Sequence, residues 1–291
     1  MSLNRIMPRN ACIALASLLA GCHDASPASG GSPAADLGAS DLGISDLLGP
    51  ASQDMTIPDG GDPSMVYVPA GTFRMGCYAA TDKQCQADES PDHDVTLHAY
   101  FIDRTEVTQA AYQACIDAGA CTPPSMDFDP AGHAAFPVNF VTREQSVAYC
   151  KWQNKRLPTE AEWERAARGT DRRLYPWGNE PPDCTRLNYS EAWPQTSCAH
   201  ATQAVATHVP GRSPTGADDM GGNVWEWVSD YYDAGYYAVS PSVDPQGPAA
   251  GMYRAKRGGS YGDPADRVRA SRRWFHFTFQ AESDIGFRCA R

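Results

Sequence analysis

The chain has 291 residues, of which 42% are apolar, so it can bury the core of one large domain or two small ones. Bulk disorder is therefore excluded. The formal net charge of -11 argues against a nucleic-acid-binding surface, because phosphate contacts need clustered lysines and arginines. The 25 glycines and 23 prolines predict many turns and irregular loops.

The first 21 residues have the pattern of an export signal. Arg5 and Arg9 precede an apolar run over residues 11–21, which is too short to remain as a membrane-spanning helix. The sequence Leu-Ala-Gly-Cys that ends at Cys22 resembles the bacterial lipobox, in which cleavage before the cysteine leaves a lipid on it. We expect an exported lipoprotein, anchored through Cys22 in the outer membrane or at the periplasmic face. An ordinary secreted protein is the alternative.

Residues 22–64 are expected to form a disordered, flexible tether. They contain seven aspartates and no lysine, arginine or glutamate, among small residues that bury little apolar area. Three of these aspartates recur every five residues and are each followed by leucine, so a docking motif is the alternative interpretation. The folded domain is then expected over residues 65–291.

Two strands are predicted at the start of the folded part. Residues 65–77 alternate apolar with small or polar positions, as a half-buried strand does. Residues 93–108 predict a second strand that leads into a helix, capped by Thr108 and ended by Gly119.

Two further helices are predicted by capping boxes, in which a threonine is followed three residues later by Glu or Gln. The two pairs are Thr142 with Gln145 and Thr159 with Glu162. The first helix cannot continue through Pro158, and the second is expected to stop at Gly169. Beyond residue 170 only turns and short strands are expected, which together predict an α+β domain.

Eight cysteines remain after Cys12 in the signal segment and Cys22 at the lipid site are set aside. An even number in an exported protein predicts disulfides. Three local pairs close short loops: Cys77 with Cys85, Cys115 with Cys121, and Cys184 with Cys198. Cys150 and Cys289 are then left for each other. Metal binding by some of the thiolates is the alternative, although no Cys-x-x-Cys spacing occurs.

Eight motifs of the folded part resemble, in order and interval, those of the sulfatase-modifying-factor, or formylglycine-generating enzyme, family. They cover residues 65–76, 101–112, 136–152, 155–169, 175–179, 216–232, 257–261 and 284–291. The resemblance implies a single compact domain of the C-type-lectin-like kind, low in regular structure. It also matches Cys150 and Cys289 to the family's long-range disulfide.

The copper site of the family is not expected in this chain. Family enzymes that use oxygen bind copper through two thiolates and oxidise the cysteine of a Cys-x-Pro-x-Arg peptide of a sulfatase to formylglycine. By position, the two thiolates fall on Asp263 and Val268, while the neighbouring Ser260 is retained. Neither can replace a thiolate, because Cu(I) prefers soft sulfur ligands. A second family disulfide is also lost as a pair, at Ala167 and Ala270.

A structural calcium ion is implied by the resemblance. Its ligands would be the side chains of Asp219 and Glu226 and the carbonyl oxygens of Gly222 and Val224, all of them oxygens suited to a hard cation. Carboxylates on a surface turn are the alternative. A second family site would use Asn188 and the carbonyl of Tyr189, but its acidic partner falls near Ser197.

Clustered aromatic and arginine residues are candidates for a ligand groove. They are Trp225, Trp227, Tyr231, Trp274, Arg269 and Arg272. Core packing is the alternative for the aromatic residues. Three functions remain open: an envelope module that binds a peptide, protein or glycan; a formylglycine-generating oxidase or related oxygen-dependent enzyme; and a stiffened surface module without a ligand.

Overall fold

The computed structural model describes residues 62–291. The predicted signal segment, Cys22 and the tether up to residue 61 lie outside the described residues. Among the helices of residues 62–291, none combines the length and the apolar character that crossing a bilayer needs. The first strand begins at Met65, the residue at which the folded domain is predicted to start.

Near the N-terminus of the folded part, the structure has four short strands where two longer ones are predicted. They are β1 (Met65–Val68), β2 (Gly71–Met75), β3 (His93–Leu97) and β4 (Tyr100–Asp103). β1 pairs antiparallel with β4, and β2 pairs antiparallel with β3. The expectation of continuous strands is wrong because Pro69 has no N–H to continue a ladder, and the His98 N–H donates to Asp244 instead.

All three predicted helices form where their caps place them. They are α1 (Gln109–Asp117), α2 (Arg143–Trp152) and α3 (Glu160–Arg168). Thr108 accepts the Ala111 N–H at 3.2 Å, and both capping boxes are complete. Gly169 ends α3 with a φ of +67°, a conformation that L side chains rarely adopt.

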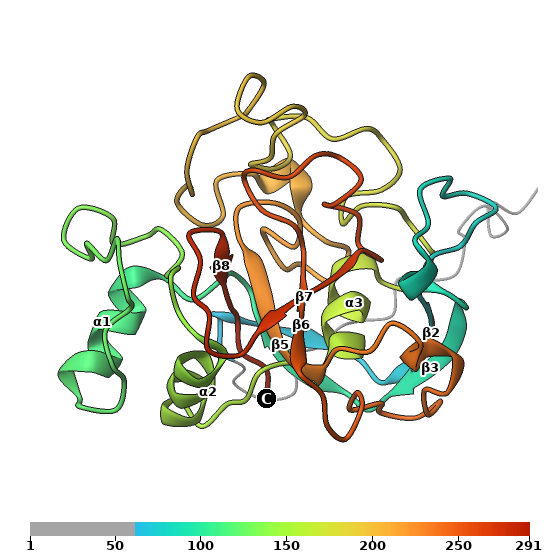
Figure 1. Ribbon diagram of the computed structural model, residues 1–291, viewed down its shortest axis with the longest axis horizontal. Coiled ribbons are helices and arrows are strands. Elements are labelled where there is room, and N and C mark those ends of the chain that lie inside the picture. Colours follow the sequence, from blue (N-terminus) through green and yellow to red (C-terminus); the bar gives the residue numbers. More distant parts are fainter. Residues whose placement is uncertain (1–61) are drawn as a thin grey trace, which may run out of the picture. The chain divides into compact units, whose positions relative to one another are not determined.

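A four-stranded sheet in the order β7-β6-β5-β8 forms the centre of the domain. Its strands are β5 (Trp225–Tyr231), β6 (Tyr253–Arg257), β7 (Arg273–Phe277) and β8 (Ile285–Gly286). Only the β5–β8 pair is parallel. Helix α3 packs against β5, β6 and β2, whereas α1 and α2 contact each other on the other side of β5 and β6 (Figure 1).

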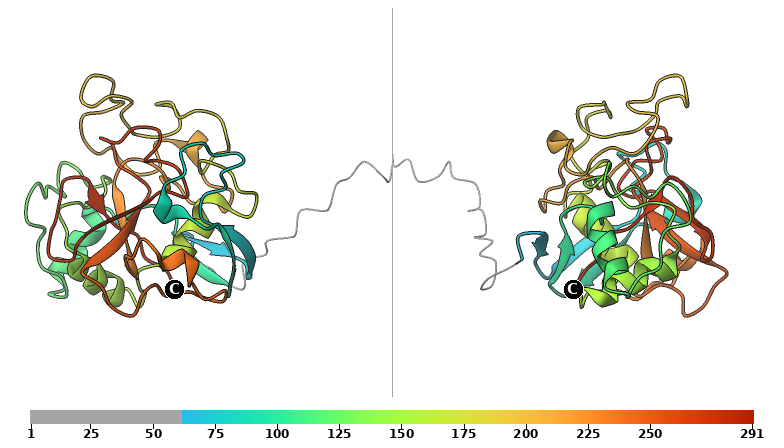
Figure 2. Two further views of the ribbon diagram at one scale, coloured as in Figure 1. Left: turned by 45° about the vertical axis from the view of Figure 1, so that its right-hand side comes forward. Right: turned by 90° about the vertical axis from the view of Figure 1, so that its left-hand side faces the viewer.

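Between α3 and β5 the described chain has only one short 3-10 helix, η2 (Val209–Gly211). Two more, η1 (Ala87–Glu89) and η3 (Tyr236–Ala238), lie before β3 and after β5. The long loops between α3 and β5 lie together above the central strands in both turned views (Figure 2). The prediction of a loop-rich second half is therefore confirmed.

Helix α3 is buried on every side. All of its charged residues except Arg165 form ion pairs. Glu160 pairs with Arg273 at 2.8 Å, and Glu164 pairs with Arg257 at 2.6 Å. Charges that are buried in this way need such partners, because an isolated buried charge is very costly.

The eight cysteines of the described chain form the four predicted disulfides. The pairs are Cys77–Cys85, Cys115–Cys121, Cys150–Cys289 and Cys184–Cys198. Cys150–Cys289 joins α2 to the C-terminus across 139 residues. The same C-terminal segment lies beside β4, where Phe101 and Arg291 exchange backbone hydrogen bonds of 2.9 and 2.8 Å.

Candidate functional site

A tight turn after β6 positions Asp263, the residue that occupies the first of the family's two thiolate positions. Gly258 and Gly259 have φ values of +100° and +75°. A Cβ on Gly259 would lie 2.7 Å from the Val268 side chain and 2.9 Å from the Arg267 carbonyl, so the turn requires glycine. The turn brings Ser260 back onto Asp263, whose Oδ2 accepts the Ser260 hydroxyl at 2.7 Å.

The Asp263 carboxylate is held by further donors. The Trp225 indole donates to Oδ2 at 2.7 Å, and the Ser260 N–H donates to the same oxygen at 3.1 Å. Arg267 donates to Oδ1 at 3.0 Å. Both oxygens of this buried side chain are therefore engaged within the protein.

Val268, at the second thiolate position, is fully buried and packs with Tyr175, Leu187 and Tyr189. It has no donor atom for a metal. The pair therefore offers one hydrogen-bonded carboxylate and one hydrocarbon side chain, which does not fit Cu(I). Every cysteine of residues 62–291 is in a disulfide, so this part of the chain has no thiolate to substitute.

Two adjoining hollows open next to the glycine turn. The first, of about 240 Å³, is lined by Trp193, Ser260, Tyr261, Gly262, Asp263, Ser283 and Asp284. The second, of about 200 Å³, is lined by Gln109, Asp127, His133, Phe136, Asn139, Ala201, Thr202, Tyr261 and Ser283. Tyr261 and Ser283 line both, and the Tyr261 hydroxyl donates to the Ser283 hydroxyl at 3.1 Å. We call the two together the Tyr261 groove.

The groove predicted from the sequence is wrong in three of its residues. Trp225 and Trp227 are core residues, 2% and 0% exposed, with the Trp227 indole bonded to the Val141 carbonyl. The Arg269 side chain is 1% exposed and pairs with Asp82 and Glu89. These residues cannot line a groove because packing and ion pairs enclose them.

The other three predicted groove residues lie outside the Tyr261 groove as well. Tyr231 has the Arg254 guanidinium 3.3 Å over its ring, and Trp274 has those of Arg267 and Arg272 about 5 Å away. Arg272 pairs with Glu89 at 3.2 Å. The groove's own Tyr261 and Asp284 belong to two of the family motifs, a signal that could have located them from the sequence.

A buried lysine of β6 lies beside the groove. Lys256 is 4% exposed and has its ammonium 5.0 Å over the Trp225 ring. Burial lowers the pKa of Lys256, and Asp284 and Asp263 oppose that shift. Burial also raises the pKa of Asp284 above its usual range. An amine and carboxylates thus lie close to one face of the groove in a poorly hydrated place.

The residues implied for calcium surround a cluster of buried charge. Glu226 accepts two hydrogen bonds from Arg288, each of 2.7 Å, and one from the Trp163 indole at 2.8 Å. Asp219 accepts the Ala206 N–H at 2.6 Å, and burial raises its pKa. The sequence interpretation missed Glu106, whose pKa is raised well above its usual range by burial and by Asp219.

The second implied calcium site is less complete. The Asn188 side-chain oxygen is enclosed and has no hydrogen-bond partner within the described residues. The Tyr189 carbonyl, however, accepts the Cys198 N–H at 2.9 Å, and the Ser197 hydroxyl donates to Ser190 at 3.0 Å. The second site therefore lacks an acidic ligand, because the family's acidic position is occupied by Ser197.

The glycine turn, the long-range disulfide and the loop-rich α+β architecture together define a domain of the formylglycine-generating-enzyme kind. A family model described as "Sulfatase-modifying factor enzyme 1-like domain" matches residues 51–291. The chain belongs to this family.

Three relatives share 26–34% of their aligned residues with this chain. A formylglycine-generating enzyme of Streptomyces coelicolor is 34% identical over 77% of this chain and 88% of its own length. An inactive C-alpha-formylglycine-generating enzyme 2 of Mus musculus is 30% identical over 79% of this chain and 86% of its own. The structure of PvdO from Pseudomonas aeruginosa has a TM-score of 0.67 and 26% identity, covering 78% and 93% of the two chains.

Proposed function

We propose that this chain is a lipid-anchored envelope protein whose family domain has lost oxidase chemistry and binds a peptide, protein or glycan. The observation that carries the proposal is the state of the two thiolate positions. Both carboxylate oxygens of Asp263 accept hydrogen bonds from within the protein, and Val268 is a buried apolar side chain. No step through copper can be written with these donors.

The Tyr261 groove supports the binding role. Its two hollows meet at Tyr261 and Ser283, so an extended ligand can occupy both. The lining mixes aromatic rings with hydroxyls, amides and carboxylates, which is the composition expected where a ligand is oriented by a few polar groups. The 48% exposure of Trp193, whose ring lies 5.7 Å from that of Tyr261, leaves apolar area for a partner.

The alternative is a formylglycine-generating oxidase that acts on sulfatase-type Cys-x-Pro-x-Arg peptides. It is favoured by the 34% identity to the enzyme of Streptomyces coelicolor. Against it stand the two replaced positions, and a relative of comparable identity whose name describes it as inactive.

The two functions are separated by offering the purified full chain a Cys-x-Pro-x-Arg peptide with copper and oxygen. We expect no aldehyde product and no copper bound in proportion to the chain. Alkylation and mass spectrometry of the same sample are expected to find all eight cysteines of the folded domain oxidised and a lipid on Cys22. The formylglycine-generating enzyme of Streptomyces coelicolor is the positive control.

Formation of the aldehyde, or one copper bound per chain, would reject the non-catalytic proposal. A mature chain without lipid on Cys22 would reject the membrane anchor alone and leave the binding role standing. Binding is then tested by titrating peptides and glycans against the chain and its Tyr261→Ala variant, in which loss of the ring weakens a ligand that occupies the groove.

We also propose that a structural calcium ion is held by Asp219, Glu226 and the carbonyl oxygens of Gly222 and Val224. The Glu106 Oε2 is enclosed without a hydrogen-bond partner among the described residues, beside Asp219. Three carboxylates with one guanidinium, Arg288, leave an excess of buried negative charge that a divalent cation would balance. The ion would share Glu226 with Arg288.

Removing calcium with a chelator is expected to lower the melting temperature, because a ligand that binds only the folded state stabilises it by about 2.7 kcal/mol at 100 times its Kd. The Asp219→Ala variant should melt at the same temperature with chelator and with calcium. Asp94→Ala, at a side chain that is 66% exposed, is the matched control and should keep the calcium response. A wild-type chain indifferent to chelator would remove the proposal.

A further inference from the structure

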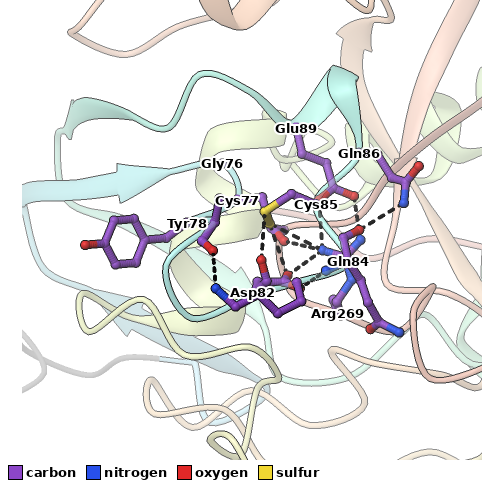
Figure 3. Close-up of a disulfide and its surroundings, with 12 residues drawn as sticks. Gly76, Cys77, Tyr78, Asp82, Gln84, Cys85, Gln86, Glu89 and Arg269 are labelled. Carbon is purple, nitrogen blue, oxygen red and sulfur yellow. Dashed lines mark hydrogen bonds and ion pairs between the residues drawn. A yellow bond between two sulfur atoms is a disulfide. The ribbon is translucent and has the colours of Figure 1, made fainter.

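The Cys77–Cys85 disulfide lies against two buried carboxylates (Figure 3). Cys77 Sγ is 3.1 Å from Asp82 Oδ2, a contact that is not a hydrogen bond because a disulfide sulfur carries no proton. One donor atom each from Cys77, Asp82, Cys85 and Glu89 can be chosen so that all four lie within 4.8 Å of one another. Elsewhere in residues 62–291, no three His, Cys, Asp or Glu side chains meet this closely.

The two carboxylates beside the disulfide are paired with arginines in the oxidised state. Arg269 donates to Asp82 Oδ2 at 2.7 Å and to both oxygens of Glu89 at 2.8 and 2.7 Å. Arg272 pairs with Glu89 at 3.2 Å. Arg272 also lies 3.8 Å from Asp88, so three carboxylates face the two guanidiniums. The two arginines hold the oxygens of Asp82 and Glu89 beside the sulfurs.

We propose that reduction of the Cys77–Cys85 disulfide converts this cluster into a zinc site with two thiolate and two carboxylate ligands. A dithiol reductant supplies the two electrons: its own sulfurs join in a disulfide, the Cys77–Cys85 bond breaks, and both cysteines become thiols. Binding of Zn²⁺ then displaces the two thiol protons to solvent. The disulfide is the metal-free, oxidised form of the site.

The charge balance favours a divalent ion. Two thiolates would add two negative charges to the cluster, and the two positive charges of Zn²⁺ offset them. Four-coordinate sites of cysteine and carboxylate ligands suit zinc, with Zn–S near 2.3 Å and Zn–O near 2.0–2.2 Å. Arg269 donates to Asp82 Oδ2 and to both Glu89 oxygens, and through these hydrogen bonds it would orient the two carboxylates.

The local chain can adjust to these distances. Apart from η1, the segment between β2 and β3 has no regular structure, and Cys85 is half-buried, which gives a reductant access. The 3.7 Å contact of Arg269 with Cys77 Sγ places a positive charge where a thiolate would form. The Cys115–Cys121 pair also closes a short loop but has no such carboxylates around it, so it serves as the control.

The test measures zinc binding by the phosphine-reduced full chain in competition with a chromophoric chelator. We expect the wild type and the Cys115→Ser/Cys121→Ser variant to bind one zinc that the Cys77→Ser/Cys85→Ser variant does not bind. Asp82→Asn, which can still accept the Gln84 N–H at Oδ1, should weaken that zinc by at least about tenfold. The oxidised wild type should not bind it.

Equal zinc binding by the wild type and by Cys77→Ser/Cys85→Ser would overturn the proposal. An unchanged affinity in Asp82→Asn would equally overturn the four-ligand site. A second measurement uses only the wild type. Cobalt added to the reduced chain is expected to give thiolate-to-cobalt charge-transfer bands in the absorption spectrum, and their absence would contradict the proposal.

Discussion

Replacing Glu226 with glutamine is expected to lower the free energy of unfolding by about 3–5 kcal/mol in chelator, and by more with calcium, because the proposed ion also loses a ligand. Glu226 is the carboxylate to which Arg288 is hydrogen-bonded, and the two side chains are 1% and 0% exposed. Both Glu226 oxygens accept hydrogen bonds, from Arg288 and from the Trp163 indole. A glutamine NH₂ must therefore face a donor in either orientation, and Arg288 loses its hydrogen-bonded counter-charge.

Urea denaturation of the full chain measures this effect, with the slope of the transition checked against the wild type. Glu180→Gln, at an exposed side chain, is the matched control and should change stability by no more than about 0.5 kcal/mol. A loss seen only in the presence of calcium would contradict the reasoning. It would mean that Glu226 stabilises the fold through the ion and not through Arg288.

Replacing both Cys150 and Cys289 with alanine is expected to cost up to about 5 kcal/mol, by the chain-entropy estimate for a closed loop of roughly 140 residues. The disulfide spans 139 residues of sequence and joins two fully buried side chains. It removes many conformations from the unfolded chain, since α2 and the C-terminus are far apart in sequence. The new alanines also leave unfilled space in the core.

The Cys115→Ala/Cys121→Ala variant is the control, because this disulfide spans only 6 residues. The same estimate gives about 2.4 kcal/mol for so short a loop. Thermal and urea unfolding of both variants give the two values. A short-loop variant that loses as much stability as the long-loop variant would show that local packing, and not loop closure, decides the contribution.

The caps of the helices could be predicted from the sequence because their hydrogen bonds join residues three apart. Thr142 with Gln145 and Thr159 with Glu162 satisfy each other without any distant partner. The strands were less predictable. Whether an alternating run forms one strand or two depends on its partner strands, and β1 and β2 pair into different sheets.

The ligand groove shows the same limit. The sequence predicts Arg269 in a groove because of its residue type. In the structure Arg269 is buried and pairs with Glu89, which is 180 residues away in the chain. Trp225 is likewise enclosed, and its indole reaches Asp263 from 38 residues away. Aromatic and arginine side chains serve cores and surfaces alike, so only the neighbours that the fold supplies decide between the two.

The amino-acid sequence by itself determined the family and the absence of thiols at positions 263 and 268, because these depend on residue identity and order. The tertiary structure alone decided that Asp263 is saturated by Trp225 and Ser260, and that Tyr261 and Ser283 join two hollows. It also placed Asp82, Glu89 and Arg269 around the Cys77–Cys85 disulfide. Hydrogen bonds and ion pairs act over a few ångströms, and only the folded chain brings residues that are distant in sequence within that range.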